Sequence, residues 1–106
     1  MSSAEIPDGV AIEAVYLIEA HYAADAAERR PAVRAQHIAR AAELKRAGVI
    51  VEVGAYSDTL TASILIVRAG SQEDALAIAG EDIYVEAGVW GKITARPFGR
   101  IAIEPS

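Results

Sequence analysis

Two strand-like segments of this 106-residue chain carry apolar residues on both faces. Successive side chains of a strand point to opposite faces, so a sheet covered by helices on one face alternates polar with apolar residues. The segments 13–21 and 61–68 break that alternation with Val15, Tyr16, Leu17, Ile18, Ile64, Leu65, Ile66 and Val67. The sequence therefore predicts a sheet that is covered on both of its faces.

The order of the elements along the chain predicts an α+β fold. Strands are expected at 13–21, 49–56, 61–68 and 90–98, the last interrupted at Pro97 and reaching at most Ile103. A first helix is expected at 31–47, beginning near Pro31 and stopping at Gly48. A second helix should begin after Ser71, which has capping-box spacing to Asp74, and end by Gly80. With a short segment at 82–88, this βαββαβ order predicts a ferredoxin-like antiparallel sheet.

The length predicts a single domain over residues 1–106, with residues 1–12 as a loose N-terminal arm. Two helices can cover only one face of such a sheet. A second copy of the chain is the economical cover for the other apolar face. We therefore expect a homodimer whose sheets meet face to face.

Composition and charge exclude several classes of function. The formal net charge of -5 disfavours a nucleic-acid partner, which requires a basic surface. No apolar run approaches the roughly 20 residues of a membrane helix, and residues 1–13 do not have the pattern of a signal peptide. The absence of cysteine excludes disulfides and thiolate metal sites. We expect a cytoplasmic protein without a nucleic-acid or membrane partner.

The basic residues gather in one stretch. Six of the ten Lys and Arg residues are Arg29, Arg30, Arg34, Arg40, Lys45 and Arg46. A solvated helix face is the common explanation of such a cluster. The alternative is that Arg34 or Arg30 attracts an anionic ligand, and an ion pair of Arg34 with Asp82 or Glu81 is a third interpretation.

His37 is predicted to lie on the packed side of the first helix. At about 100° per residue, an arc of about 140° holds Val33, Arg34, His37, Ile38, Ala41, Leu44 and Lys45. The opposite side holds Gln36, Arg40, Glu43 and Arg46. A histidine in this position is either structural or a general acid–base, because it exchanges protons near neutral pH.

Several short motifs, taken in order, resemble the YCII-like (YciI-related) family. They comprise Arg34, Ala35, Gln36, His37 and Ile38, then Gly48, Val49, Ile50 and Gly54, then Glu81, Asp82, Ile83, Tyr84 and Gly88, and last Arg96, Pro97 and Phe98. The resemblance covers about residues 14–101. It implies a ferredoxin-like unit that forms a dimeric α+β barrel, and a His–Asp pair made by His37 and Asp82. Ile83 and Ala55 stand where the family often has proline.

The resemblance implies a cofactor-independent enzyme, since some similar proteins eliminate chloride from chloroaromatic compounds. We expect lyase or isomerase chemistry on a cyclic or aromatic metabolite, with His37 and Asp82 catalytic. Arg34, Tyr84 and Tyr56 are the candidate substrate-binding residues, and no metal or cofactor is expected. The alternative is a non-catalytic dimeric module that binds a metabolite or a protein. Cofactor-free oxygenation, and His21 as the base in place of His37, are weaker alternatives.

Overall fold

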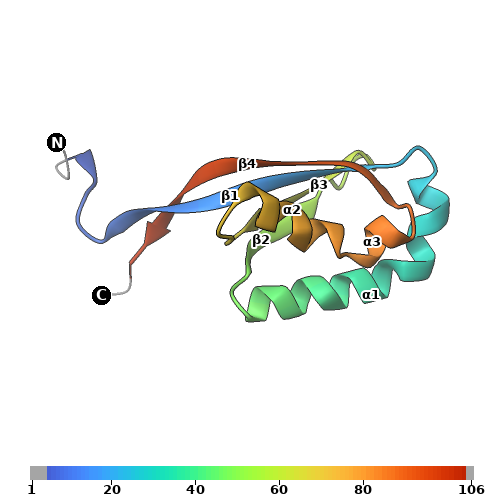
Figure 1. The fold of residues 1–106 in the computed structure, drawn as a ribbon, viewed down its shortest axis with the longest axis horizontal. Helices are drawn as coiled ribbons and strands as arrows, with labels where there is room; N and C mark the ends of the chain where they lie inside the picture. The colour runs from blue at the N-terminus through green and yellow to red at the C-terminus, as the bar shows by residue number, and fades with distance from the viewer. Residues whose placement is uncertain (1–4, 105–106) are drawn as a thin grey trace.

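A computed structural model describes residues 5–104, which form one four-stranded sheet and three helices. The elements are β1 (Val10–Tyr22), α1 (Ala26–Arg46), β2 (Ile50–Ala55), β3 (Ala62–Val67), α2 (Gln72–Gly80), α3 (Ile83–Glu86) and β4 (Trp90–Ile103). The strands are antiparallel and lie in the order β2-β3-β1-β4. All three helices lie on the same face of the sheet (Figure 1). The predicted ferredoxin-like α+β fold is confirmed.

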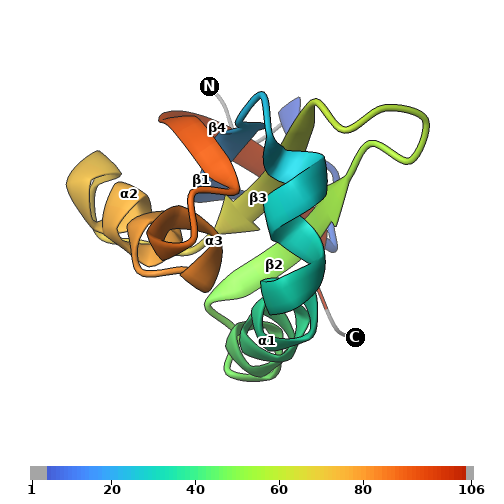
Figure 2. The same ribbon diagram turned by 90° about the vertical axis from the view of Figure 1, so that its right-hand side faces the viewer.

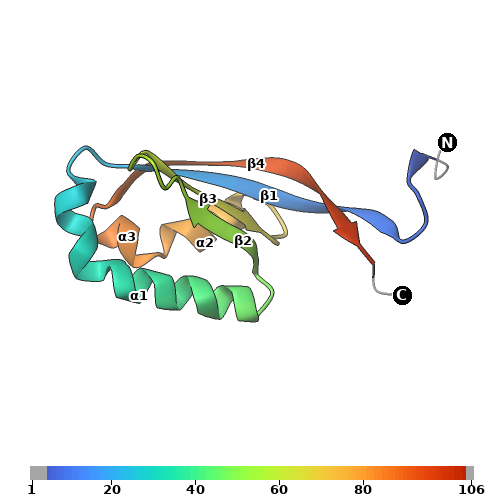
Figure 3. The ribbon, with the colours of Figure 1, turned by 180° about the vertical axis from the view of Figure 1, so that it is seen from behind.

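The helix α1 begins at Ala26, so the prediction that it begins near Pro31 was wrong. Pro31 lies inside the helix, where it cannot donate a backbone hydrogen bond. Figures 1 and 3 show that α1 changes direction in its first part, which is the usual effect of an internal proline. The predicted stop is correct, because Gly48 follows the helix with a φ of 80°. In the part of the chain that the structure describes, no helix is both long and apolar enough to cross a membrane.

Local capping signals give the correct positions of the shorter helices. The Ser71 hydroxyl accepts a hydrogen bond from the Asp74 backbone N–H at 3.0 Å, as the spacing predicted. The one-turn helix α3 begins after Asp82, whose side chain accepts from the Tyr84 backbone N–H at 2.9 Å. Residues 82–88 therefore form a capped turn that fixes the Asp82 carboxylate.

The antiparallel pair of strands β1 and β4 is longer than predicted. β1 begins at Val10, so residues 10–12 belong to the sheet and not to a loose arm; residues 1–4 of that arm lie outside the described residues. β4 continues through Pro97, which pairs with Tyr16 on the edge of the sheet, so the predicted interruption was wrong. An edge strand tolerates proline because one side of it needs no donor.

The beginning of β1 and the end of β4 project beyond the helices and carry exposed apolar residues. The structure measures 51 × 28 × 23 Å along its principal axes, and Figure 1 shows these paired strand ends at one end of the longest axis. Ile12, Ile101 and Ile103 are 52%, 69% and 77% exposed. A lone chain therefore leaves large apolar side chains in water at this end.

The face of the sheet that meets the helices holds the core. Ile18, Leu65 and Val67 on this face pack with Tyr84 and Trp90. The opposite face carries the half-buried Leu17, Ile64 and Ile66. Figure 2, which looks along the molecule, shows the helices gathered on one side of the sheet only. The helices therefore bring the side chains of α1 and α3 together beside the core, where the candidate site lies.

Candidate active site

His37 and Asp82 form a direct hydrogen bond between α1 and the start of α3. Nδ1 of His37 lies 2.8 Å from Oδ1 of Asp82, and the two side chains are 12% and 3% exposed. The same oxygen caps α3 through the Tyr84 backbone N–H. The orientation of the carboxylate is therefore set by its helix-capping hydrogen bond. This cap requires extended backbone at Asp82, and it does not require a proline in the place of Ile83.

Arg40 is a part of the site that the sequence reasoning missed. Its Nη1 donates to Oδ2 of Asp82 at 3.2 Å, and its Nη2 donates to the Ile78 carbonyl at 2.9 Å. The prediction that Arg40 lies on the solvated side of the helix was wrong, because α2 and α3 widen the covered side of α1. Arg40 follows His37 by three residues, and this spacing was the available signal. Arg40 thus takes the ion pair with Asp82 that was considered for Arg34.

The Asp82 carboxylate is buried but remains stable as an anion. Burial alone would raise its pKa, but the hydrogen bonds from His37 and Tyr84 act in the other direction. The charges of His37 and Arg40 add to those hydrogen bonds and hold the pKa of Asp82 below its usual range. Asp82 is therefore ionised near neutral pH and can accept a hydrogen bond from the imidazole.

Aromatic rings fix the plane of the His37 imidazole. The Tyr84 ring stacks on it with centroids 3.7 Å apart and planes 9° apart. Trp90 stands edge-on to both rings, with centroids 5.2 Å from His37 and 5.4 Å from Tyr84. The ring is thus oriented by stacking as well as by the carboxylate.

A pocket of about 350 Å³ opens beside the imidazole. Its polar lining comes from Tyr22, Arg30, Arg34, His37, Lys45 and Ser63, with Tyr84 also at the wall. Its apolar lining comes from α1 and β2, and includes Ile38, Ala42 and Val53. Nε2 of His37 has no hydrogen bond among the described residues and is not one of their sealed polar atoms. The pocket side of the ring is therefore free to meet a ligand.

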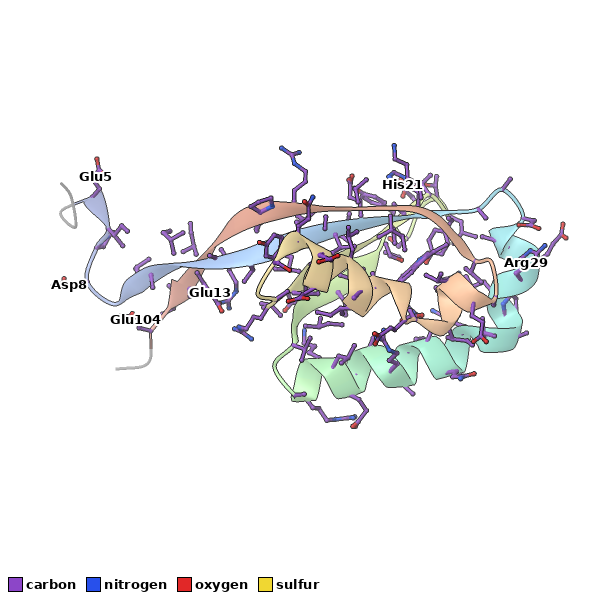
Figure 4. All side chains as sticks on the ribbon, viewed as in Figure 1. Glu5, Asp8, Glu13, His21, Arg29 and Glu104 are labelled. Atoms are coloured by element: carbon purple, nitrogen blue, oxygen red, sulfur yellow. The ribbon has the colours of Figure 1, made fainter. Side chains whose placement is uncertain are left out.

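The structure brings only some of the predicted residues together. Arg34 and Tyr84 line the pocket with His37. Tyr56 is 55% exposed and borders a neighbouring shallow hollow with Arg30 and Arg34. His21 projects from the face of the sheet opposite the helices (Figure 4) and lies near Glu19. His21 therefore does not line the pocket, which disfavours it as the base.

The family is decided by sequence comparison. The model of the YCII-related domain family matches residues 14–99. The chain belongs to this family. Membership confirms the family resemblance drawn from the motifs around His37 and Asp82. A search of curated proteins gave no match.

One solved structure that resembles this chain in fold comes from an enzyme. It is 5-chloro-2-hydroxyhydroquinone dehydrochlorinase (TftG) from Burkholderia phenoliruptrix AC1100, in complex with 2,5-dihydroxybenzoquinone. The two sequences are 21% identical, and the TM-score is 0.68. The match covers 79% of this chain and 92% of that chain. At this identity the similarity establishes the shared fold.

The described residues of this YCII domain contain no cluster suited to a metal ion. Within residues 5–104, no three side chains of His, Asp or Glu lie close enough together to hold one. The polar groups around the pocket are instead basic side chains and hydroxyls. Their chemistry suits proton transfer and the binding of anionic or hydroxylated ligands.

Replacing Asp82 with asparagine is expected to remove a part of the free energy of unfolding that is present at neutral pH and lost in acid. A carboxyl whose pKa is lowered on folding stabilises the fold above about pH 4, and that contribution is lost as the pH falls further. We expect Asp82→Asn to lower the free energy of unfolding at pH 7 by about 1.5–3 kcal/mol. Urea unfolding between about pH 7 and pH 3 should show the difference shrinking in acid.

Glu81→Gln is the matched control, because Glu81 is 76% exposed and lies 4.0 Å from the same Arg40. It makes the same chemical change one residue earlier, and should shift stability by less than about 0.5 kcal/mol. Parallel pH curves for the wild type and Asp82→Asn would contradict the prediction.

Proposed function

We propose that this YCII protein is a small-molecule enzyme of the lyase or isomerase type, acting by cofactor-independent acid–base chemistry. The observation that carries the proposal is the 2.8 Å contact between His37 Nδ1 and Asp82 Oδ1, on a ring that also lines a pocket. A histidine sealed in packing would have favoured a non-catalytic module. The open pocket beside Nε2 favours the enzyme.

The proposed roles follow from the direction of the hydrogen bonds. Asp82 accepts the Nδ1 proton of the neutral ring, which leaves the Nε2 lone pair as the base. After Nε2 takes a proton, the Asp82 carboxylate stabilises the imidazolium. The proton on Nε2 can then return to another atom of the ligand, which completes an isomerisation.

An elimination of chloride would use the same base. His37 Nε2 removes a proton from the ligand, and the electron pair left behind forms a new double bond. The carbon–chlorine bond breaks at the same time, and chloride leaves with its bonding electrons. The step balances without an oxidant or a reductant. General acid–base help of this kind contributes about 10²–10⁴ in rate.

The substrate class is a compact cyclic or aromatic metabolite. A pocket of about 350 Å³ holds little more than one substituted ring. The similarly folded dehydrochlorinase acts on a chlorinated hydroxyhydroquinone and binds a dihydroxybenzoquinone, which supports a ring of this size. Arg34 would contact a polar group of the substrate, and Tyr84 would form a wall. Tyr56 would contact only a substrate that extends past Arg30 and Arg34.

The proposal is tested by offering chlorinated and non-chlorinated hydroxyhydroquinones to the purified protein. Chloride release and the ultraviolet spectrum of the ring would be followed, with a chelator present and oxygen removed. We expect turnover under these conditions. If no ring compound in the panel is converted although several bind, the non-catalytic binding module is correct. Turnover that requires oxygen would support an oxygenase.

We also propose that the working form is a homodimer. The half-buried apolar residues on the open face of the sheet and the exposed Ile12, Ile101 and Ile103 support a partner of the same kind. Light scattering at micromolar concentration should give twice the chain mass of 11.2 kDa. Ile101→Lys should weaken the association. A wild-type mass of one chain would rule out the dimer.

A further inference from the structure

Two arginines of the pocket differ from the other bases of α1. Arg29, Arg40, Lys45 and Arg46 each pair with a carboxylate. Among the described residues, neither Arg30 nor Arg34 has a carboxylate within 4.0 Å. Arg34 follows Arg30 by four residues, so the two side chains lie on the same side of the helix. The uncompensated charges of α1 are thus both at the pocket.

Arg30 is held in place at the pocket wall. Its guanidinium lies over the Tyr22 ring at 5.6 Å from the ring centre. Its Nε is buried and has no hydrogen-bond partner among the described residues. Arg30 lines the pocket and has no carboxylate partner among the described residues, so its charge favours a ligand that brings a negative charge.

The Tyr84 hydroxyl lies in the field of the same two arginines. Burial raises the pKa of Tyr84, while the nearby Arg30 and Arg34 charges act in the opposite direction. His37 stacks on the same Tyr84 ring, and both arginines line the pocket together with it. The two arginines and the imidazole thus face the same pocket.

The rest of the pocket offers nothing that would repel an anion. None of the described residues that line it is Asp or Glu. Ser63 donates its hydroxyl proton to Tyr22 Oη at 3.0 Å, so the Tyr22 proton is free to bind a ligand oxygen. The apolar Ile38, Ala42 and Val53 lie nearby and suit the faces of a ring.

We propose that Arg30 and Arg34 form an anion subsite, and that the pocket binds a compact ring compound bearing a carboxylate. Guanidinium groups match the two oxygens of a carboxylate better than a single-atom anion. The ring would lie on the apolar wall, with its carboxylate on the two arginines and its far side toward His37. This inference rests on the proposed use of the pocket, and it names the substrate class.

The test compares benzoate with benzamide, which has the same shape but no charge. Calorimetric titration at low salt should show benzoate binding at least about tenfold more tightly than benzamide to the wild type. Arg34→Gln should weaken benzoate binding by about 10- to 100-fold and leave benzamide within about twofold. Arg30→Lys keeps the charge of the half-buried residue but removes the planar guanidinium that can donate two hydrogen bonds to a carboxylate. It should also weaken benzoate binding.

Arg46→Gln is the matched control, because Arg46 is on the same helix, pairs with Glu43 and does not line the pocket. It should leave benzoate affinity within about twofold of the wild type. An equal loss in Arg46→Gln would mean a general charge effect and would overturn the subsite. Equal binding of benzoate and benzamide, or no binding of benzoate, would overturn it as well.

Two further ligands and one variant separate the possible failures. If phenolate or 2,5-dihydroxybenzoquinone needs the two arginines and benzoate does not, the carboxylate assignment is wrong. His37→Gln should still bind benzoate in a way that depends on Arg34, because the proposed contacts of the carboxylate are with the two arginines. Benzoate binding that depends on the arginines would support the subsite even if no ring compound were turned over. The absence of turnover would then contradict only the proposed enzyme function.

Discussion

Replacing His37 with glutamine is expected to lower turnover of the substrate found in the ring-compound assay by about 10²–10⁴. Glutamine can still donate a hydrogen bond to Asp82, but it cannot accept a proton near neutral pH. The free energy of unfolding should therefore fall by only about 1 kcal/mol. The measurement is kcat/KM for both proteins, together with urea unfolding of each.

The chain offers a matched control in its other histidine. His21 is exposed and lies on the opposite face of the sheet (Figure 4), so His21→Gln should keep the wild-type kcat/KM. An equal loss in the two variants, or full activity in His37→Gln, would remove His37 from the mechanism. Binding of benzoate separates a loss of chemistry from a loss of the pocket.

The orientation of the imidazole gives a second measurement that needs no substrate. The carboxylate of Asp82 accepts from Nδ1, so the neutral ring should carry its proton there. Nitrogen chemical shifts of His37 should report this tautomer in the wild type. Asp82→Asn should lose the preference, because a neutral amide attracts the Nδ1 proton far less. An unchanged tautomer in that variant would show that stacking on Tyr84 is sufficient.

The fold could be predicted from the sequence because its signals are local. The cap at Ser71, the stop at Gly48 and the strand patterns are each encoded within a few residues. The start of α1 was missed because Pro31 is most often found in a first turn, and here it lies inside the helix. The buried Ala26 before it is held by packing that no local pattern reveals.

The sequence predicted the His37–Asp82 pair of the candidate site and two residues of the pocket beside it, Arg34 and Tyr84. The motifs gave His37 and Asp82, and the helix arc brought Arg34 to the same side. Arg40 was missed because the helix arc considers only the direction in which a side chain leaves the helix. The long side chain of Arg40 reaches around the helix to Asp82, which lies on another element. The Ser63–Tyr22 contact joins residues that are 41 positions apart, so it depends on the pairing of β1 with β3.

Replacing Tyr84 with alanine is expected to destabilise the fold by about 3–5 kcal/mol, the largest stability effect we expect from one substitution. Tyr84 is 1% exposed and has the largest fully buried side chain in the described chain. Its ring packs on His37 and Trp90 at the same time, so truncation opens a cavity beside both. Urea unfolding at pH 7 measures the loss.

Tyr84→Phe separates the ring from the hydroxyl. It keeps the stacked face and should cost less than about 1.5 kcal/mol, because the volume changes little. If the ring alone matters, Tyr84→Phe should turn over substrate at nearly the wild-type rate. If the hydroxyl contacts the substrate, KM should rise with little change in stability. A loss in Tyr84→Phe as large as that in Tyr84→Ala would contradict a stacking role, because the phenylalanine ring would still cover the imidazole of His37.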